Sequence, residues 1–259
     1  MKIAHWNVGY NAQMSQIYEQ LKNNLGDNFI AILLEMTPEK KEELLALFNN
    51  DIKYAYSLDY RKPGKFDGKN RKLGVLLLTS AEIVIEAAGV FERTLFPDRT
   101  LWANVNIDGQ SLKIVGFHSI TGCSHKTAKS TNFLSMAEAI DEYRPDILTM
   151  DANEPDVDHY DIRQMRFFEK NGRGAGIFFE EILNEGLVDA YAEGYNTENY
   201  EEGNPLAVSH VINGTGSEKR YDFVMIKPTR IKQIGTEYRY RDAINATADH
   251  AIVIVECSI

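Results

Sequence analysis

The sequence predicts a mixed α/β (α+β) fold, because short apolar strands alternate with amphipathic helices along the whole chain. The chain has 259 residues, 44% hydrophobic and 25% charged, which suits a globular protein with a large core. Residues 101–107 alternate apolar and polar positions, and Asp108-Gly109 follows as a hairpin signal. A hairpin joins antiparallel strands, so we expect mixed rather than purely parallel sheets.

Other strands are expected where short apolar runs are bounded by polar or turn-forming residues. The runs FIAILL and LGVLLLT are apolar throughout and predict two strands that are buried on both faces. The strands predicted in addition to 101–107 lie at 2–6, 29–34, 52–58, 73–79, 110–117, 146–150, 222–227 and 251–256.

Apolar residues at helical spacing predict the helices between these strands. Thr37 as N-cap and Pro38 at the first helical position are typical of a helix start. A helix over about 126–143 would bury Phe133 and Ile140 on one side, and another is expected over about 175–185. The first helix would bury Met14, Ile17, Tyr18, Leu21 and Leu25.

The chain shows no internal repeat and no linker, so we interpret residues 1–259 as a single domain. No signal peptide is evident, and no apolar run approaches the ~18–20 residues that span a bilayer, which favours a cytoplasmic protein. Cys123 and Cys257 do not build a disulfide framework. The net charge of -10 argues against a generally basic nucleic-acid-coating protein, although a local patch or a bound cation can still set the field at a site.

Polar functional residues lie at the ends of six predicted strands. Four strands end in such a residue and two later strands begin with one. These residues are Asn7, Glu35, His118, Asp151, Asp222 and the pair Asp249-His250. In a mixed sheet the ends of some strands meet the starts of others at one rim, so these side chains can converge. Carboxylates gathered there repel one another unless a cation or a proton intervenes, and oxygen ligands suit a hard divalent ion.

Each of these residues also has an ordinary structural explanation. Asn7 is typical of a turn or cap, and Asp151 with Asn153 can form an Asx turn. His118 at a strand end can be a hydrogen-bonded structural histidine. Their joint order along the chain nevertheless favours a functional site, because the structural context is what confirms a short motif.

The order of HWNVGY, LLEM, VGFHS, MDANEP, RYDFVMI and ADHAIVIV resembles the endonuclease/exonuclease/phosphatase superfamily, from residue 3 to about 256. This resemblance implies the deoxyribonuclease-I-like fold, a four-layer α/β-sandwich of two packed mixed β-sheets flanked by helices. The chain departs from the family pattern at Met150 and Ala152, where Gly and Phe are usual around the Asp, and at Leu34 and Ala248. None of these departures removes a catalytic group. They indicate a divergent subfamily.

The resemblance also implies roles for the metal and the attacking water. Glu35 resembles the principal metal-ligating carboxylate, with Asn7 beside it and Asp249 as a second ligand or metal-shell residue. Asp151 resembles the residue that orients or deprotonates the attacking water, and Asn153 the one that holds the phosphate and that water. Mg²⁺ is the expected cofactor, and Mn²⁺ suits the same carboxylate ligands.

The remaining implied roles concern the phosphate. His250 resembles the histidine that contacts the phosphate, with Asp222 as its orienting carboxylate. His118 matches a position that contacts the phosphate or the leaving group, and Arg99 one that often contacts the phosphate. Together these residues predict a metal-dependent phosphodiesterase.

A basic segment favours a nucleic acid as the substrate. Residues 59–72 hold six Lys or Arg against two Asp, and their Gly and Pro residues predict a loop. Tyr60 and Phe66 could stack on bases, although a solvated surface loop is the alternative. We therefore expect a nuclease, with DNA favoured over RNA. The predicted phosphate-binding residues of this loop are Arg61, Lys62, Lys65, Lys69, Arg71 and Lys72.

Two other functions stay open. One is a phosphatase or phospholipase of the same superfamily that acts on a small phosphoester, a phosphoinositide or sphingomyelin. The other is a non-catalytic nucleic-acid-binding member, which would be expected to have lost one of the site residues, whereas all are present. The poorly patterned segment 192–220 is expected to be a long loop beside the site.

Overall fold

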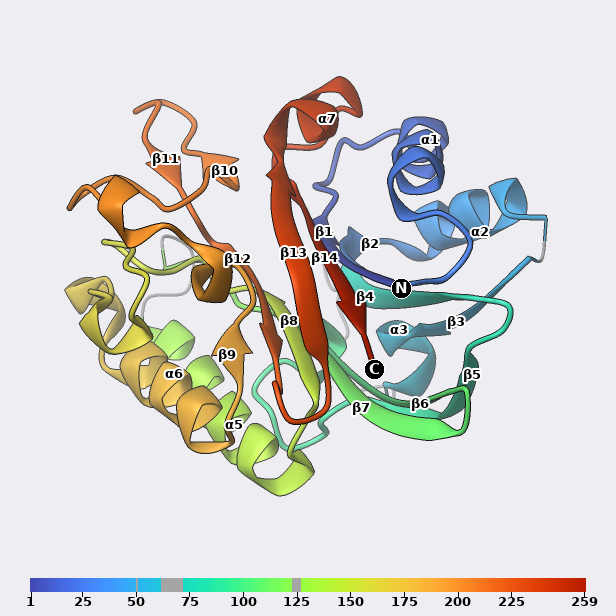
Figure 1. The fold of residues 1–259 in the computed structure, drawn as a ribbon, viewed down its shortest axis with the longest axis horizontal. Helices are drawn as coiled ribbons and strands as arrows, with labels where there is room; N and C mark the ends of the chain where they lie inside the picture. The colour runs from blue at the N-terminus through green and yellow to red at the C-terminus, as the bar shows by residue number, and fades with distance from the viewer. Residues whose placement is uncertain (50, 62–71, 123–126) are drawn as a thin grey trace.

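The computed structural model describes residues 1–49, 51–61, 72–122 and 127–259. Two six-stranded mixed sheets pack face to face, and helices cover their outer faces (Figure 1). The predicted four-layer α/β-sandwich is therefore confirmed.

The first sheet has the strand order β13-β14-β1-β2-β4-β3. Strands β1 and β2 are parallel to each other, and every other neighbouring pair is antiparallel. The strands are β1 (Lys2–Asn7), β2 (Phe29–Met36), β3 (Ile52–Tyr56), β4 (Gly74–Ser80), β13 (Lys232–Arg239) and β14 (Ile252–Ser258). Because β1 and β2 run the same way, their carboxyl ends reach the same edge of the sheet.

The second sheet has the order β5-β6-β7-β8-β12-β9, and only β7 and β8 are parallel. The strands are β5 (Val84–Gly89), β6 (Thr100–Ile107), β7 (Gln110–His118), β8 (Ile147–Asp151), β9 (Val188–Asp189) and β12 (Asp222–Ile226). Asp108 and Gly109 join β6 to β7 with φ of 51° and 85°. Both angles are left-handed, as the predicted two-residue hairpin turn requires.

Helices cover the two sheets from outside. The first sheet packs against α1 (Met14–Leu25), α2 (Pro38–Leu47) and α7 (Tyr240–Asn245), and the second against α5 (Thr127–Tyr143) and α6 (Gly174–Asn184). Thr37 caps α2 as predicted, because its side chain accepts a hydrogen bond from the Lys40 backbone N–H.

The central core lies between the two sheets. The alternation in β6 directs Leu101, Ala103, Val105 and Ile107 into this layer, as the sequence pattern predicted. Ile3 of β1 lies in the same layer from the other sheet. Buried apolar residues of this kind supply the largest favourable term in folding. They also fix the two sheets relative to each other, and with them the strand ends that carry the polar residues.

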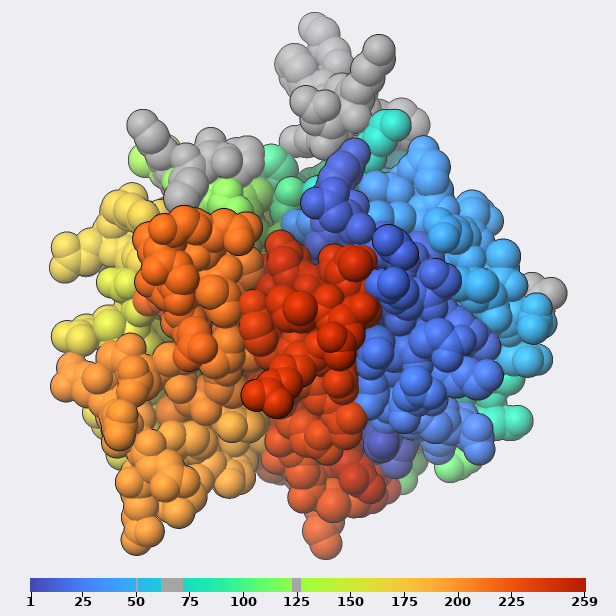
Figure 2. All heavy atoms as spheres, turned by 90° about the horizontal axis from the view of Figure 1, so that it is seen from above, coloured from blue at the N-terminus to red at the C-terminus, as the bar shows by residue number. Residues whose placement is uncertain are grey.

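Several elements were not predicted. The run predicted as a strand over 52–58 ends at Tyr56, and a single helical turn, α3 (Ser57–Tyr60), follows. The segment 192–220 holds two short 3₁₀ turns and a small hairpin, β10 (His210–Val211) with β11 (Glu218–Lys219), rather than an unstructured loop. In Figure 2, this hairpin region, α7 and α1 lie side by side on one face of the molecule. Within the described residues, no helix is long and apolar enough to cross a membrane.

Candidate active site

The rim at one end of the two sheets brings the predicted polar residues together. His118, Asp151 and Asp222 are paired in register across three neighbouring strands of the second sheet. Asn7 and Glu35 lie at the carboxyl ends of the parallel strands β1 and β2 in the first sheet. The opposite directions of β8 and β12 explain how the end of one strand meets the start of the other.

Asp151 is almost completely buried at this rim, with 1% of the residue exposed. The Asn7 side-chain N–H₂ donates to its Oδ2 at 2.9 Å, and the Asn153 backbone N–H donates to its Oδ1 at 2.9 Å. Burial raises the pKa of Asp151, and the Asp222 carboxylate adds to that rise. Its carboxylate is therefore fixed in orientation and made more basic than an ordinary aspartate.

Glu35 reaches the site from an irregular part of β2. Its φ of 61° is in the left-handed region, and the pairing of β2 with β4 shifts register between Leu33 and Met36. Such an irregularity re-aims a side chain and is frequent beside active sites. Burial raises the pKa of Glu35, and the neighbouring carboxylates of Asp151 and Asp249 raise it further.

Asp222 lies between two histidines. Its Oδ2 is 2.7 Å from His250 Nδ1, and its Oδ1 is 3.0 Å from His5 Nε2. Burial by itself would raise the pKa of Asp222, but His250 and His5 outweigh burial and lower it. Burial would likewise lower the pKa of His250, but Asp222 and then Asp151 raise it to about 10. His250 is therefore an imidazolium at neutral pH, anchored through Nδ1.

His118 has the opposite character. Burial, and then the Arg99 guanidinium, hold its pKa well below the usual value. Arg99 Nη1 lies 3.0 Å from His118 Nδ1 and 3.2 Å from Nε2. The His118 ring is neutral, so its Nε2 forms no ion pair with Glu35 Oε1 at 3.8 Å or with Asp151 Oδ2 at 3.6 Å. Both distances also exceed the hydrogen-bonding range.

A tight turn after β1 closes one side of the site. Gly9 has φ of 71°, and a Cβ at this position would lie 2.5 Å from Asp249 Oδ1, so only glycine fits here without a shift. The Gly9 backbone N–H donates to Asn7 Oδ1 at 3.1 Å, and Lys40 Nζ donates to the Gly9 carbonyl at 2.7 Å. This turn thus holds Asn7 and the exposed Asp249 next to each other.

Asn153 is held by a buried network that the sequence analysis did not identify. Its φ is 49°, and its side-chain N–H₂ donates to the Ser119 carbonyl at 3.2 Å. Lys129 Nζ donates to the Asn153 carbonyl at 2.6 Å and lies 3.4 Å from Glu154 Oε1. A lysine in the first turn of α5 gives no sequence signal of this role, because its partners lie 24 and 25 positions away.

His210, in the hairpin region, was also missed. Its ring stacks on that of His250 with centroids 4.3 Å apart and an angle of 29° between the planes. Its Nδ1 lies 3.1 Å from the Asp249 carbonyl. The neighbouring Ser209 Oγ accepts hydrogen bonds from the backbone N–H groups of Tyr221 and Asp222. The expectation that segment 192–220 lies beside the site thus agrees with the position of His210.

Only part of the predicted basic loop lies in the described structure. Lys62, Lys65, Phe66, Lys69 and Arg71 lie outside the described residues. Arg61 Nη1 lies 3.4 Å from Asp98 Oδ2, and Asp98 directly precedes Arg99. Lys72 is exposed. Arg61 therefore lies close to the site, whereas a contact of this loop with substrate stays a prediction.

The donor set of the rim fits a hard divalent cation. Glu35, Asp151 and Asp249 are close enough that Asp151 and Asp249 both raise the pKa of Glu35. Glu35 keeps 22% of its side chain exposed, and Asn7 offers an amide oxygen beside it. Oxygen ligands with access for water suit Mg²⁺ or Mn²⁺. Asp222 is less suitable as a ligand, because each of its oxygens already contacts a histidine.

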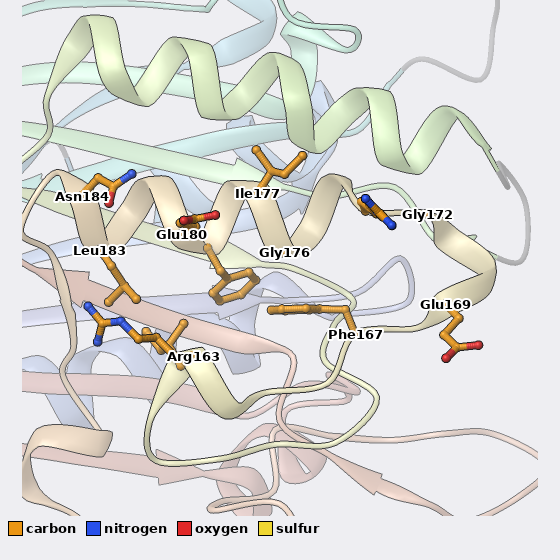
Figure 3. Close-up of a pocket in the computed structure, with 12 residues that line it drawn as sticks. Arg163, Phe167, Glu169, Gly172, Gly176, Ile177, Glu180, Leu183 and Asn184 are labelled. Carbon is orange, nitrogen blue, oxygen red and sulfur yellow. The ribbon is translucent and has the colours of Figure 1, made fainter.

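A separate surface pocket of about 880 Å³ lies between α6 and residues 162–173 (Figure 3). Phe167, Ile177 and Glu180 are among the residues that line it. None of the predicted site residues lines this pocket.

Comparison with known proteins identifies the fold. No protein-family model and no curated protein matches the sequence. Among solved structures, a D. rerio TDP2 humanized by 14 mutations has a TM-score of 0.67 at 14% identity, covering 100% of this chain and 99% of that one. An endonuclease/exonuclease/phosphatase from Bacteroides vulgatus has a TM-score of 0.67 at 15% identity, and the match covers 100% of this chain and 98% of that one. The human Nocturnin catalytic domain with bound sulfate has a TM-score of 0.64 at 12% identity, and the match covers 100% of this chain and 93% of that one.

These likenesses extend over the whole chain. The protein therefore has the endonuclease/exonuclease/phosphatase fold, as its sequence resemblance implied. At these low identities the comparison establishes the fold, so the activity has to be argued from the site.

Proposed function

We propose that this protein is a metal-dependent phosphodiesterase that hydrolyses nucleic acid with an activated water molecule. The observation that carries the proposal is the composition of the rim. A carboxylate fixed by two hydrogen bonds, Asp151, lies beside a histidine that its own carboxylate partner keeps protonated, His250. A group that accepts a proton and a group that donates one are thus available at one place.

The metal would be held by Glu35, Asn7 and Asp249. When bound, Mg²⁺ or Mn²⁺ offsets the negative charge of the phosphodiester and stabilises charge that develops in the transition state. The raised pKa of Glu35, caused by burial and by Asp151 and Asp249, supports this assignment, because a cation would relieve that repulsion.

Asp151 is positioned to orient the attacking water and to accept its proton. Its two hydrogen bonds, from Asn7 and Asn153, fix the carboxylate plane, and burial raises its pKa toward that of an effective base. A positioned general base of this kind contributes about 10²- to 10⁴-fold to a rate.

The other residues would act on the phosphate. His250 can donate from Nε2 to a phosphate oxygen or to the departing oxygen, because Asp222 holds its Nδ1. Arg99 adds a fixed positive charge next to the neutral His118, and guanidinium groups bind phosphate oxygens strongly. Asn153 is held in place by Lys129 and can contact the phosphate beside Asp151.

A nuclease is favoured over a phosphatase or phospholipase for small phosphoesters. Arg61, the first basic residue of the segment 59–72, contacts Asp98, which directly precedes Arg99, in a chain that is otherwise acidic. Two proteins of the same fold support this choice, a D. rerio TDP2 complexed with a single-strand DNA product and the TRAS1 endonuclease domain. DNA is therefore proposed ahead of RNA as the substrate.

The test is cleavage of plasmid DNA, single-stranded DNA and RNA with Mg²⁺ or EDTA, alongside bis-p-nitrophenyl phosphate and inositol phosphates. Asp151→Asn and His250→Ala should each strongly reduce the activity. The matched control Asp141→Asn alters the exposed Asp141, which lies near the half-buried Glu181 and Glu185, and should leave the activity unchanged. Activity on small phosphoesters alone would move the protein to the phosphatase alternative. Nucleic-acid binding without any cleavage would support the non-catalytic one.

A further inference from the structure

The turn that follows β1 presents an aromatic side chain beside the candidate active site. Tyr10 comes directly after Gly9, where an added Cβ would lie 2.5 Å from Asp249 Oδ1. Hydrogen bonds from the Gly9 N–H to Asn7 and from Lys40 to the Gly9 carbonyl fix this turn. Tyr10 is therefore carried on a constrained piece of backbone next to Asn7, one of the proposed metal-binding residues.

Tyr10 is 70% exposed, the highest value among the large hydrophobic side chains of the described structure. No aromatic ring of the described residues packs on it. A scattered exposed tyrosine is common and needs no explanation by itself. The distinguishing feature of Tyr10 is its position at the rim, since binding residues concentrate on loops that a rigid scaffold positions.

Lys40 links this ring to the acidic centre. Its Nζ lies 5.7 Å from the centroid of the Tyr10 ring. Burial lowers the pKa of Lys40, and the Glu35 and Asp249 carboxylates oppose that shift, so both act on this ammonium group. An ammonium has three donors, and only one is used by the Gly9 carbonyl among the hydrogen bonds of the described residues. A further donor can therefore reach a phosphate oxygen.

We propose that Tyr10 and Lys40 form a subsite that stacks an unpaired nucleobase and holds the adjacent phosphate, next to the phosphodiester that is cleaved. This inference rests on the proposed nuclease function and specifies its substrate as a single strand. Stacking on an aromatic ring needs a free base face, which duplex DNA does not offer. A cation beside the ring adds affinity for the sugar-phosphate backbone without reading sequence.

The structure contains a matched control for this pair. Tyr54 in β3 is 44% exposed, and Lys41 Nζ lies 5.5 Å from its ring centroid. The Tyr54 and Lys41 pair thus has the same two residue types as the Tyr10 and Lys40 pair, but Tyr54 lies on the edge strand of the first sheet and Lys41 pairs with Glu42 and Asp59. A general effect of losing an exposed tyrosine would appear in both variants.

The experiment compares wild type, Tyr10→Ala, Tyr10→Trp and Tyr54→Ala. Steady-state kinetics would use single-stranded oligothymidine, an abasic oligonucleotide with the same number of phosphates, and bis-p-nitrophenyl phosphate. Tyr10→Ala should raise KM for oligothymidine on the order of tenfold, the usual range for one base stack, with kcat unchanged. Tyr10→Trp should restore KM, and Tyr54→Ala should match wild type.

The small substrate and the abasic strand separate the possible failures. Tyr10→Ala should leave kcat/KM unchanged for both, because neither can stack a base on the ring in the way proposed. An unchanged KM for oligothymidine, or an equal loss on the abasic strand, would overturn the subsite. If wild type cleaves none of these substrates, the proposed function fails. In that case, fluorescence anisotropy would measure the binding of labelled oligothymidine in EDTA. The proposed subsite is overturned if Tyr10→Ala binds as well as wild type, or if wild type does not bind.

Discussion

Two clusters of charged side chains in this protein, one buried around Arg220 and one at the rim, are built in opposite ways. Around Arg220 the charges are closely paired: its Nε and Nη2 each donate to Asp158 at 2.8 Å, and its Nη1 donates to Asp189 at 2.5 Å. At the rim, Glu35, Asp151 and Asp249 bring carboxylates together instead. Burial by itself lowers the pKa of Arg220, but Asp158 and Asp189 raise it well above the usual value. Burial and like charges both raise the pKa of Glu35.

This difference indicates that the charges around Arg220 belong to the structural scaffold, whereas the carboxylates at the rim belong to the candidate site. A buried guanidinium with two carboxylates and a ring 4.5 Å away, that of Phe223, is satisfied by the protein itself. Asp158 also accepts a hydrogen bond from the Leu206 N–H, so this cluster holds the segment that leads to His210. The carboxylates at the rim are not balanced in this way, and such an arrangement persists where a ligand completes it.

Replacing Asp151 should give the largest effect on activity. Asp151→Asn keeps the shape of the side chain but removes the base, so the rate should fall about 10²- to 10⁴-fold. Initial rates of bis-p-nitrophenyl phosphate hydrolysis with Mg²⁺ would measure this loss, and circular dichroism would check the fold. A variant that keeps most of its activity would remove Asp151 from the proposed mechanism.

Breaking the paired cluster should affect stability rather than chemistry. Arg220→Met leaves Asp158 and Asp189 buried without their cation, which typically costs about 3–5 kcal/mol in the free energy of unfolding. Urea denaturation would measure the cost, with Arg163→Met as the control because the Arg163 side chain is 74% exposed. A loss as small as that of the control would show that the cluster is not part of the scaffold.

A cation should stabilise the folded protein through the rim. At a concentration 100 times its dissociation constant, Mg²⁺ or Mn²⁺ should raise the free energy of unfolding by about 2.7 kcal/mol, because it binds the folded state alone. Thermal unfolding with the metal and with EDTA would detect the shift. Asp249→Asn should reduce the shift. The absence of any shift for wild type with either metal would contradict the proposed metal site.

The smallest expected effect is an increase in the free energy of unfolding, whereas Arg220→Met should decrease it. Glu35→Gln removes one of the mutually repelling carboxylates, so without metal it should stabilise the protein by about 0.5–2 kcal/mol, the usual gain from relieving a functional site. The same variant should lose the stabilisation by metal. Urea denaturation in EDTA would measure the gain, and a clear loss of stability would mean that Glu35 is part of the scaffold.

Local patterns allowed much of the architecture to be predicted. The alternation in 101–107, the Asp108-Gly109 turn and the Thr37 cap depend on neighbours within a few residues, and each is present in the structure. The polar residues at strand ends could also be identified as candidate site residues, because each directly follows or precedes a local apolar run. Strands with polar or short patterns, such as β13 and β9, were missed because an exposed edge or a two-residue pairing leaves little hydrophobic signal.

By itself, the sequence therefore determined the fold class and the set of polar residues that the rim brings together. Only the tertiary structure decided which of them touch: Asp222 meets His5 across 217 positions, and Asn7 meets Asp151 across 144. The structure also added the stacking of His210 on His250 and the pairing of Arg220 with two distant carboxylates. The physical reason is that periodicity records which face of an element is buried, whereas contacts between distant elements depend on strand order, register and the packing of the two sheets.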